Sequence, residues 1–172
     1  MKEKMKSKIK DFFQGFGYFL LALVICITTN TFVMARGVVV GHSMDNNFYD
    51  GENFVIDKLS YHFKDPERFD VIVFDTGNQY YLIKRVIGLP SETVQIDETG
   101  AIYINGERLQ EGYGKEPMVN AGRASAEIVL GEDEYFVLGD NRNNSSDSRS
   151  ETIGNIHRSQ IVGKVGITID MR

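Results

Sequence analysis

The sequence predicts a mostly β protein in which twisted antiparallel sheets form a partly closed, barrel-like domain, preceded by one N-terminal transmembrane helix. Two observations predict the sheets. Short runs of β-branched and aromatic residues recur between turn residues, and helical periodicity is scarce beyond residue 36. An uncharged apolar run near the N-terminus predicts the helix. The chain of 172 residues has room for one core of ordinary size.

The composition excludes several classes of protein. With 42% hydrophobic and 25% charged residues, the chain is too apolar to be disordered and too charged for a multi-pass membrane protein. Its net charge of -5 disfavours nucleic acid as a partner. The single cysteine, Cys26, excludes an internal disulfide, and three scattered histidines make a poor set of metal ligands. We expect no metal and no cofactor.

Residues 12–35 form the predicted transmembrane helix. They carry no formal charge, and as a helix they would reach about 36 Å, enough for a hydrocarbon core of about 30 Å. A cleavable signal peptide is the alternative, but its apolar region is shorter and ends in a small-residue site, which this run lacks. Residues 1–11 are rich in lysine, so the positive-inside bias predicts a basic cytoplasmic tail and places residues 36–172 outside.

Strands are predicted wherever β-branched and aromatic residues lie between turn residues. The predicted strands are 37–40, 53–57, 70–74, 80–87, 93–96, 101–104, 135–138 and 161–169. Turns are expected at 97–100 and at Asn105-Gly106. Residues 106–126 contain several Gly residues and a Pro with few candidates for the core, so we expect a surface loop there.

The segment from Gly41 to Met44 places the hydroxyl of Ser43 directly after an apolar strand. Serine is common in turns, so this position alone is more often structural than catalytic. His42 is a poor base for Ser43, because neighbouring residues of an extended chain point to opposite sides. A Ser-His-Asp triad is therefore disfavoured.

The strand predicted at 80–87 carries two adjacent cations among apolar residues. Alternation places Lys84 and Arg85 on opposite faces, so at least one of them must enter apolar surroundings. Burial disfavours an ammonium group and lowers its pKa toward the working pH, as a general base requires. The alternative is that Lys84 extends its head to water from an edge strand.

A third unusual segment is the polar loop at 139–149, which follows the strand predicted at 135–138. A buried loop of this composition must satisfy its donors and acceptors internally. Its paired Asp and Arg residues would do so. The three segments together are more specific than any one of them.

In order and content these segments resemble the boxes of type I signal peptidases, membrane-bound serine proteases with a Ser and Lys dyad. The single N-terminal span resembles the short form typical of Gram-positive bacteria. The resemblance implies that Ser43 is the nucleophile, that Lys84 is the general base, and that Ser145 orients the lysine. It also implies a set of residues that hold the site together, with Arg85 and Asp140 as partners. These site-supporting residues are Arg85, Asp140, Arg142, Asp147 and Arg149.

The resemblance further implies an endopeptidase of the plasma membrane that removes N-terminal signal peptides from secreted precursors after an Ala-X-Ala-like site. The precursor is expected to dock as an added strand between 38–40 and 81–83. Expected partners are the precursors, the lipid bilayer and a secretion translocon. The residues expected to bind substrate are Val39, Met44, Phe48, Leu82 and Ile83.

The chain departs from the family pattern after the expected nucleophile. Asn46-Asn47 stands where the family usually has Pro-Thr, so a different cleft shape is expected. Gly41 stands where some relatives have Ser, which leaves the amide of Ser43 to form the oxyanion hole. Two alternatives stay open. One is a specialised pilin-processing or non-catalytic pilus-assembly member. The other is a self-cleaving regulator like the SOS repressors, which would need a DNA-binding module in place of residues 1–35.

Overall fold

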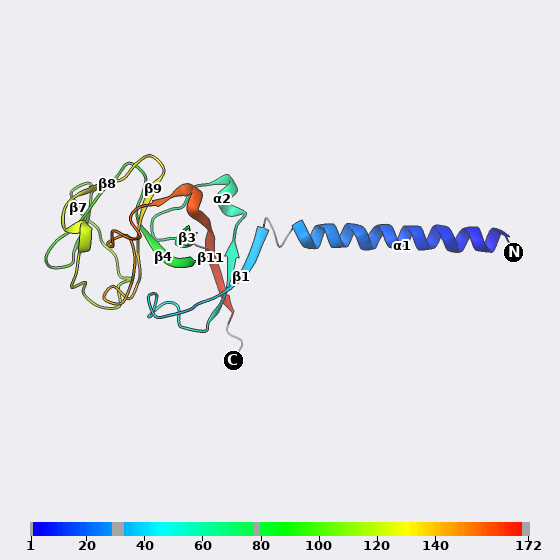
Figure 1. The fold of residues 1–172 in the computed structure, drawn as a ribbon, viewed down its shortest axis with the longest axis horizontal. Coiled ribbons are helices and arrows are strands. Elements are labelled where there is room, and N and C mark those ends of the chain that lie inside the picture. The colour runs from blue at the N-terminus through cyan, green and yellow to red at the C-terminus, as the bar shows by residue number, and fades with distance from the viewer. Residues whose placement is uncertain (1, 29–32, 78–79, 170–172) are drawn as a thin grey trace.

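The structure, a computed structural model, describes residues 2–28, 33–77 and 80–169, and of residues 2–11 and 169 it describes the backbone alone. Figure 1 shows one long helix, α1 (Lys2–Thr28), projecting from a domain built of strands. The strands form one seven-stranded and one four-stranded sheet. The mostly β, antiparallel fold predicted from the sequence is therefore confirmed.

The larger sheet is antiparallel throughout the pairs that build it. From edge to edge its strands are β1 (Met34–Val38), β2 (Asn53–Asp57), β11 (Ile161–Ile169), β3 (Val71–Asp75), β4 (Tyr81–Gly88), β9 (Glu134–Leu138) and β10 (Ile156–His157). Register shifts interrupt the pairing of β11 and of β4, and such bulges increase twist and bend a sheet. The result is a curled sheet with β1 and β10 at opposite edges, which makes an open half-barrel.

The smaller sheet carries the two predicted turns. Its strands, in spatial order, are β7 (Glu107–Arg108), β6 (Ile102–Ile104), β5 (Thr93–Ile96) and β8 (Ile128–Val129). At 97–100, Asp97 Oδ1 accepts a hydrogen bond of 2.8 Å from the amide of Thr99. Asn105 and Gly106 join β6 to β7 with φ values of 51° and 78°, the positive angles of a tight hairpin turn. Both turns lie where the sequence predicts them.

Most predicted strands lie close to observed ones. Those predicted at 53–57, 93–96 and 161–169 match β2, β5 and β11 at both ends. The strand predicted at 37–40 is displaced, because the ladder between β1 and β2 covers Met34–Val38. The sequence predicts none of β7, β8 and β10, which are each two residues long and cannot show alternation.

Residues 106–126 hold more structure than the surface loop predicted there. They include β7 and a 3-10 turn, η2 (Gly122–Ser125). Met118 and Ala124 are buried in the core of the smaller sheet. Most of the segment is exposed or half-buried, and these two residues are the part that the surface-loop prediction misses, because isolated apolar residues between glycines give no periodic pattern.

Three apolar clusters fill the domain. One lies between the smaller sheet and strands β4 and β9, and a second includes Tyr61 of the short helix α2 (Ser60–Phe63). The third joins Val39 and Met44 to strands β2, β3 and β11. Since Met44 is only 1% exposed, the third cluster fixes the chain directly after Ser43.

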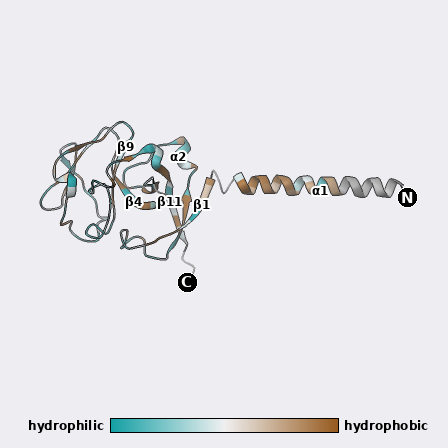
Figure 2. Cartoon of the chain, in the orientation of Figure 1, coloured by the Kyte–Doolittle hydropathy of each residue, from teal (hydrophilic) through white to brown (hydrophobic). Residues whose placement is uncertain are grey.

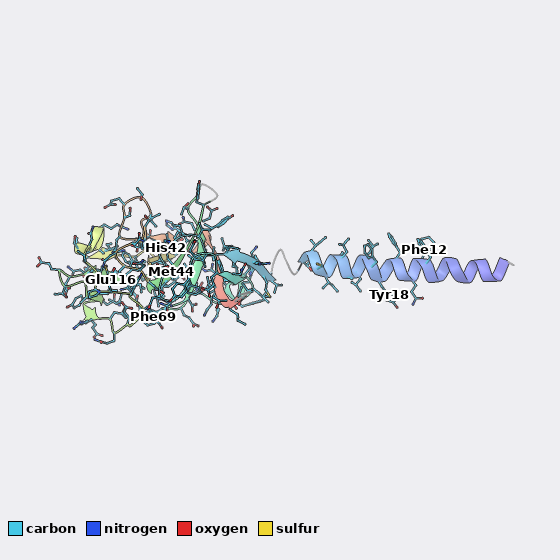
Figure 3. All side chains as sticks on the ribbon, turned by 90° about the horizontal axis from the view of Figure 1, so that it is seen from below. Phe12, Tyr18, His42, Met44, Phe69 and Glu116 are labelled. Carbon is cyan, nitrogen blue, oxygen red and sulfur yellow. The ribbon has the colours of Figure 1, made fainter. Side chains whose placement is uncertain are left out.

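The helix α1 differs in its bounds from the transmembrane helix predicted at 12–35. It begins at Lys2 and ends at Thr28, residues 34 and 35 belong to β1, and residues 29–32 lie outside the described part. The threonines at its end are β-branched and disfavour helix. Figure 2 colours much of the described part of α1 as hydrophobic, and Figure 3 shows side chains that project from it, Phe12 and Tyr18 among them. No helix in the described ranges is both long enough and apolar enough to cross a membrane.

Candidate active site

The loop that carries Ser43 follows β1 and is fixed at both ends. Gly41 adopts a φ of 93°, and its amide donates a hydrogen bond of 2.8 Å to Asp50 Oδ1. After Ser43, the amide of Phe48 donates to the carbonyl oxygen of Met44 at 2.9 Å. Because Met44 is buried in the core, the backbone next to Ser43 is held in place.

Lys84 lies next to the hydroxyl of Ser43. Its Nζ donates hydrogen bonds to Ser43 Oγ at 2.7 Å and to the carbonyl oxygen of Ile83 at 2.8 Å. Lys84 belongs to β4, an interior strand with β3 on one side and β9 on the other, and it is only 1% exposed. The alternative of a lysine that reaches water from an edge strand is therefore wrong.

Burial sets the protonation of this lysine. Removal from water lowers the pKa of Lys84 to about 8, and the negative charges of Asp147 and Asp140 oppose the shift. A pKa near 8 leaves a substantial neutral fraction at mildly alkaline pH. A neutral amine at hydrogen-bond distance can accept the proton of a serine hydroxyl.

Arg85, the next residue of β4, forms a buried ion pair. Its Nε donates to Asp140 Oδ1 at 2.8 Å and its Nη2 donates to Asp140 Oδ2 at 2.5 Å, a bidentate arrangement. Asp140 is fully buried, and Arg85 Nη1 donates to the carbonyl oxygen of Phe69 at 2.9 Å. The guanidinium also lies 3.9 Å from the ring centre of Tyr113. The structure thus contains the pairing of Arg85 with Asp140 that the resemblance implies.

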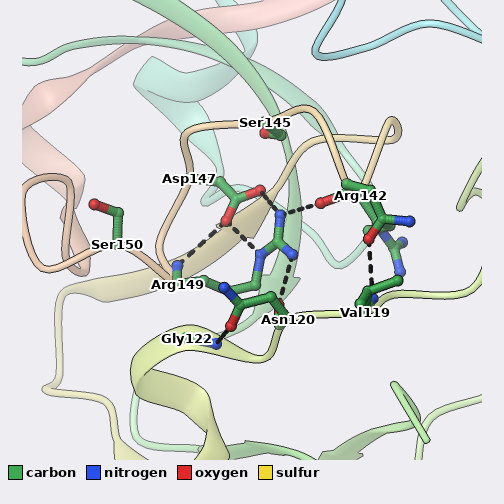
Figure 4. A pocket seen from close by; sticks show the side chains of 9 residues that line it. Val119, Asn120, Gly122, Arg142, Ser145, Asp147, Arg149 and Ser150 are labelled. Atoms are coloured by element: carbon green, nitrogen blue, oxygen red, sulfur yellow. Dashed lines mark hydrogen bonds and ion pairs between the residues drawn. The ribbon is translucent and has the colours of Figure 1, made fainter.

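The polar loop at 139–149 is largely buried, and two of its charged residues, Arg149 and Asp147, pair with each other. Arg149 donates from Nε to Asp147 Oδ1 and from Nη2 to Asp147 Oδ2, each at 2.8 Å, and also from Nη2 to the carbonyl oxygen of Arg142 (Figure 4). Asp147 Oδ2 also accepts the amide of Gly139 at 3.1 Å. The loop and residues 119–122 line a pocket of about 650 Å³. These hydrogen bonds fix the loop, and its Asp147 interacts electrostatically with Lys84.

Ser145 does not make the expected hydrogen bond to Lys84. Its Oγ is buried and has no hydrogen-bond partner in the part of the chain that the structure describes, whereas the lysine donates to Ser43 Oγ and to the carbonyl oxygen of Ile83. Ser145 instead packs against Gly139, where an added Cβ would overlap Ser145 and would lie 2.5 Å from the carbonyl oxygen of Ser43. Ser145 thus lies beside the site, but the hydrogen bonds of Lys84 go to Ser43 and Ile83.

Sequence reasoning missed several residues that hold this site. The backbone amide of Asn141 donates to the carbonyl oxygen of Ser43 at 3.0 Å. The side-chain Nδ2 of Asn141 donates to the carbonyl oxygen of His42 at 2.9 Å. Glu111 Oε1 accepts a hydrogen bond of 2.6 Å from Arg142 Nη1. Burial raises the pKa of Glu111, but the hydrogen bond and charge of Arg142 outweigh it, so the pKa lies below its usual value. Only the position of Asn141 inside the polar loop could have indicated such a role.

The predicted substrate-binding residues do not all come together. Val39 and Met44 are buried in one cluster, and Phe48 and Ile83 pack against it, so these four form a continuous apolar floor. Leu82 packs against the separate cluster below α2. The prediction for Leu82 is corrected here, because neighbouring residues of a strand face opposite sides of the sheet.

The histidines lie apart from Ser43 in their contacts. His42 Nδ1 is 3.4 Å from Asp45 Oδ1, His62 Nδ1 is 2.8 Å from the carbonyl oxygen of Lys58, and His157 Nδ1 is 3.4 Å from the carboxylate of Asp133. Among the described residues, no group of three or more His, Cys, Asp or Glu side chains could hold a metal ion. The side chain that hydrogen-bonds the hydroxyl of Ser43 is instead that of Lys84.

Comparison with known proteins identifies the family of this chain. Residues 12–169 match the family described as signal peptidase, peptidase S26. Signal peptidase I of Bacillus amyloliquefaciens is 32% identical over 169 residues, which cover 94% of this chain and 88% of that protein. Signal peptidase I V of Bacillus subtilis (strain 168) is 35% identical over 157 residues, which cover 85% of this chain and 92% of that protein.

A solved structure was also found, a crystal structure of a signal peptidase I from Enterococcus faecalis V583. It is 34% identical, covers 60% of this chain and 98% of its own, and superposes with a TM-score of 0.48. The sequence matches over most of the chain define a serine endopeptidase, a hydrolase of peptide bonds. The protein belongs to the signal peptidase family, peptidase S26.

Proposed function

We propose that this protein is a membrane-bound signal peptidase that removes N-terminal signal peptides from secreted precursors, with Ser43 as nucleophile and Lys84 as general base. One observation carries the proposal: Lys84 Nζ lies 2.7 Å from Ser43 Oγ, and the lysine is 1% exposed. The contact supplies the geometry for proton transfer, and burial lowers the pKa of the amine to about 8, so that a larger fraction of it is neutral.

The proposed reaction has two halves. In the first, neutral Lys84 takes the hydroxyl proton as Ser43 Oγ attacks the scissile carbonyl carbon, and the lysine returns that proton to the departing amine. In the second, Lys84 takes a proton from a water molecule that attacks the acyl ester, and the alkoxide of Ser43 leaves with that proton. The products are the mature protein with a free amino group and the signal peptide with a free carboxylate.

Docking of the precursor as an added strand is supported by the free edges of the sheet. β1 is the edge strand of the larger sheet, and β9 pairs with β4 only from Arg85 onward in the described chain. The backbone at 81–83 is therefore open on that side for an extended peptide. Val39 and Met44 are buried, with Phe48 and Ile83 packed against them, and the proposal is that this apolar surface receives the small side chains of an Ala-X-Ala-like site.

Membrane attachment is proposed through α1. The helix carries exposed apolar side chains from Phe12 to Ile27, and the residues before Phe12 are rich in lysine. The positive-inside bias predicts that this basic end stays in the cytoplasm, and the proposal accordingly assigns the domain to the outer side of the plasma membrane. Tethering keeps the site near precursors, which are themselves held in the bilayer by their signal peptides, beside the translocon. The 2.7 Å contact favours an enzyme over a non-catalytic assembly factor.

The test uses the full chain in detergent micelles with a precursor that carries an Ala-X-Ala site, and a matched precursor with bulky residues there. We expect one cut after the small-residue site and none in the matched precursor. Ser43→Ala is expected to abolish the cut and to leave thermal unfolding unchanged. Cleavage by Ser43→Ala at the normal rate would overturn the proposal. A pilin precursor in the same assay separates a specialised peptidase from a general one.

A further inference from the structure

The turn after Ser43 makes a contact that the nucleophile box alone does not suggest. Asn47 lies on this turn, and its Nδ2 donates a hydrogen bond of 2.8 Å to Asp140 Oδ2. Asp140 is fully buried at the start of the polar loop. The Asn47 amide thus joins two segments that are 93 residues apart in the chain.

The acceptor of this bond is itself immobile. Asp140 receives two hydrogen bonds from Arg85, and its carbonyl oxygen accepts the amide of Lys115 at 2.8 Å. The bidentate pair fixes the plane of the carboxylate. A side chain that binds such a group is therefore held in one place. Hydrogen bonds to charged groups are also stronger than those between neutral groups.

The same carboxylate leads back to the dyad. Arg85, which binds it, follows Lys84 on β4, and Asn47 lies four residues after Ser43. Two sets of hydrogen bonds therefore join the Ser43 turn to β4. One is the bond between Lys84 and Ser43, and the other runs from Asn47 through Asp140 to Arg85. A displacement of the Ser43 turn away from β4 would have to break both sets.

The backbone permits this arrangement through Asn46. Its φ is 93°, in the left-handed region that asparagine tolerates and that proline, fixed near -65°, cannot adopt. The amides of Asn47 and Phe48 both donate to the carbonyl oxygen of Met44, at 3.2 and 2.9 Å. The turn that begins at Met44 therefore has Asp45 and Asn46 at its centre, and its two hydrogen bonds hold Asn47 at its end.

We infer that Asn47 is a positioning residue that holds Ser43 at proton-transfer distance from Lys84 by binding the Arg85–Asp140 pair. The inference rests on the proposed dyad. The Asn47 side chain donates to Asp140 and, at 3.5 Å, to the carbonyl oxygen of Tyr113, and it is not among the residues of the apolar floor. Its loss should therefore reduce the chemical step and leave docking of the precursor unchanged.

The experiment compares Asn47→Leu and Asn47→Asp with Asn155→Leu in the full chain. Asn155 is the matched control, because its Nδ2 donates to Glu134 Oε2 at 2.6 Å at the end of β9 farther from Gly139. The measurements are kcat and KM for a peptide with the Ala-X-Ala site, and the midpoint of urea unfolding. Asn47→Asp keeps the size of asparagine but replaces its donor with a carboxylate that repels Asp140, so it breaks the contact without a change of volume and carries the test even if Asn47→Leu unfolds.

For both Asn47 variants we expect kcat to fall about tenfold or more, equivalent to about 1.4 kcal/mol, with KM within about twofold. We expect Asn155→Leu to keep both constants within about twofold. If Asn47→Asp has the kcat of the wild type, or if KM rises while kcat is kept, the positioning role is overturned. An active Ser43→Ala would instead overturn the dyad itself, so the two failures are distinguishable.

Discussion

Lys84 and Arg85 are consecutive residues of β4 that are both buried and that bind different partners. Lys84 reaches Ser43 Oγ, and Arg85 forms a bidentate pair with Asp140. The alternation of a strand requires two neighbouring side chains to leave opposite faces, so one strand can supply both a poorly hydrated amine and a fully paired guanidinium. The arginine keeps its charge through its partner, and the lysine, which lacks an ion pair at this position, loses part of its affinity for a proton.

The rate of cleavage should rise with pH through the pKa of Lys84. Burial lowers this pKa to about 8, so the lysine is mostly charged below pH 8 and mostly neutral above it. Only the neutral amine can take the hydroxyl proton. We therefore expect kcat/KM to fall about tenfold for each pH unit below about 7 and to level off above about 9. The measurement is kcat/KM between pH 6 and pH 10. A rate independent of pH over this range would contradict the role of Lys84.

Lys84→Met should be inactive and yet more stable than the wild type at pH 7. The pKa of Lys84 is about 8 when folded against an ordinary 10.5, so the unfolded chain binds more protons and the wild type gains stability as pH rises from 8 to 10.5. Below pH 8 the buried charge costs on the order of 3 kcal/mol, which methionine avoids.

Urea unfolding of both proteins at pH 7 and at pH 10 checks this expectation. The advantage of Lys84→Met should be largest at pH 7 and should shrink at pH 10. A variant that is less stable than the wild type at pH 7 would show that the lysine does not bear a burial cost.

Ser145→Ala should stabilise the fold, whereas Ser148→Ala should destabilise it. Ser145 Oγ is buried without a hydrogen-bond partner, so its removal relieves an uncompensated desolvation, worth about 1 kcal/mol. Ser148 Oγ accepts the amide of Val137 at 3.0 Å, so its removal leaves a buried donor unpaired at a cost of about 1 to 3 kcal/mol. Chemical denaturation measures both. Equal losses of stability in the two variants would contradict the unpaired state of Ser145.

Asn46→Pro should impair the protein although the family usually has proline at this position. The φ of 93° at Asn46 cannot be adopted by proline, whereas glycine adopts it without strain. We expect kcat/KM to fall about tenfold in Asn46→Pro and to stay within about twofold in Asn46→Gly, with the peptide assay as the measurement. Full activity of the proline variant would show that the turn does not depend on this angle.

The sequence predicts the long strands because alternation and flanking turn residues act locally. The strands at 53–57, 93–96 and 161–169 match the structure for this reason. Strands of two residues, such as Ile156–His157, depend on a partner that is distant in sequence, and no local pattern marks them. The end of α1 at Thr28 is a similar case. Hydropathy alone predicts that the helix continues to residue 35, but the polar, β-branched residues at its end disfavour helix and β1 begins at Met34.

The residues of the site also divide into those that the sequence indicates and those that only the folded structure shows. Ser43, Lys84 and the polar loop stand out in the sequence because each breaks the pattern of strand and turn. Tyr113 does not, since a tyrosine among glycines is ordinary, and Asn47 stands out only as a departure from the family pattern, with nothing to indicate its contact with Asp140. Their contacts with Arg85 and Asp140 arise only when the excursion after β7 and the turn after Ser43 fold onto the polar loop.

The most direct test of the central claim is the pKa of Lys84 itself, measured by NMR on the full chain in micelles with 13C at the lysine Cε atoms. The resonance of Lys84 is identified by its absence from the spectrum of Lys84→Met. We predict a midpoint near pH 8 for this resonance. A midpoint at 10.5, the ordinary value for lysine, would contradict a neutral amine poised beside Ser43.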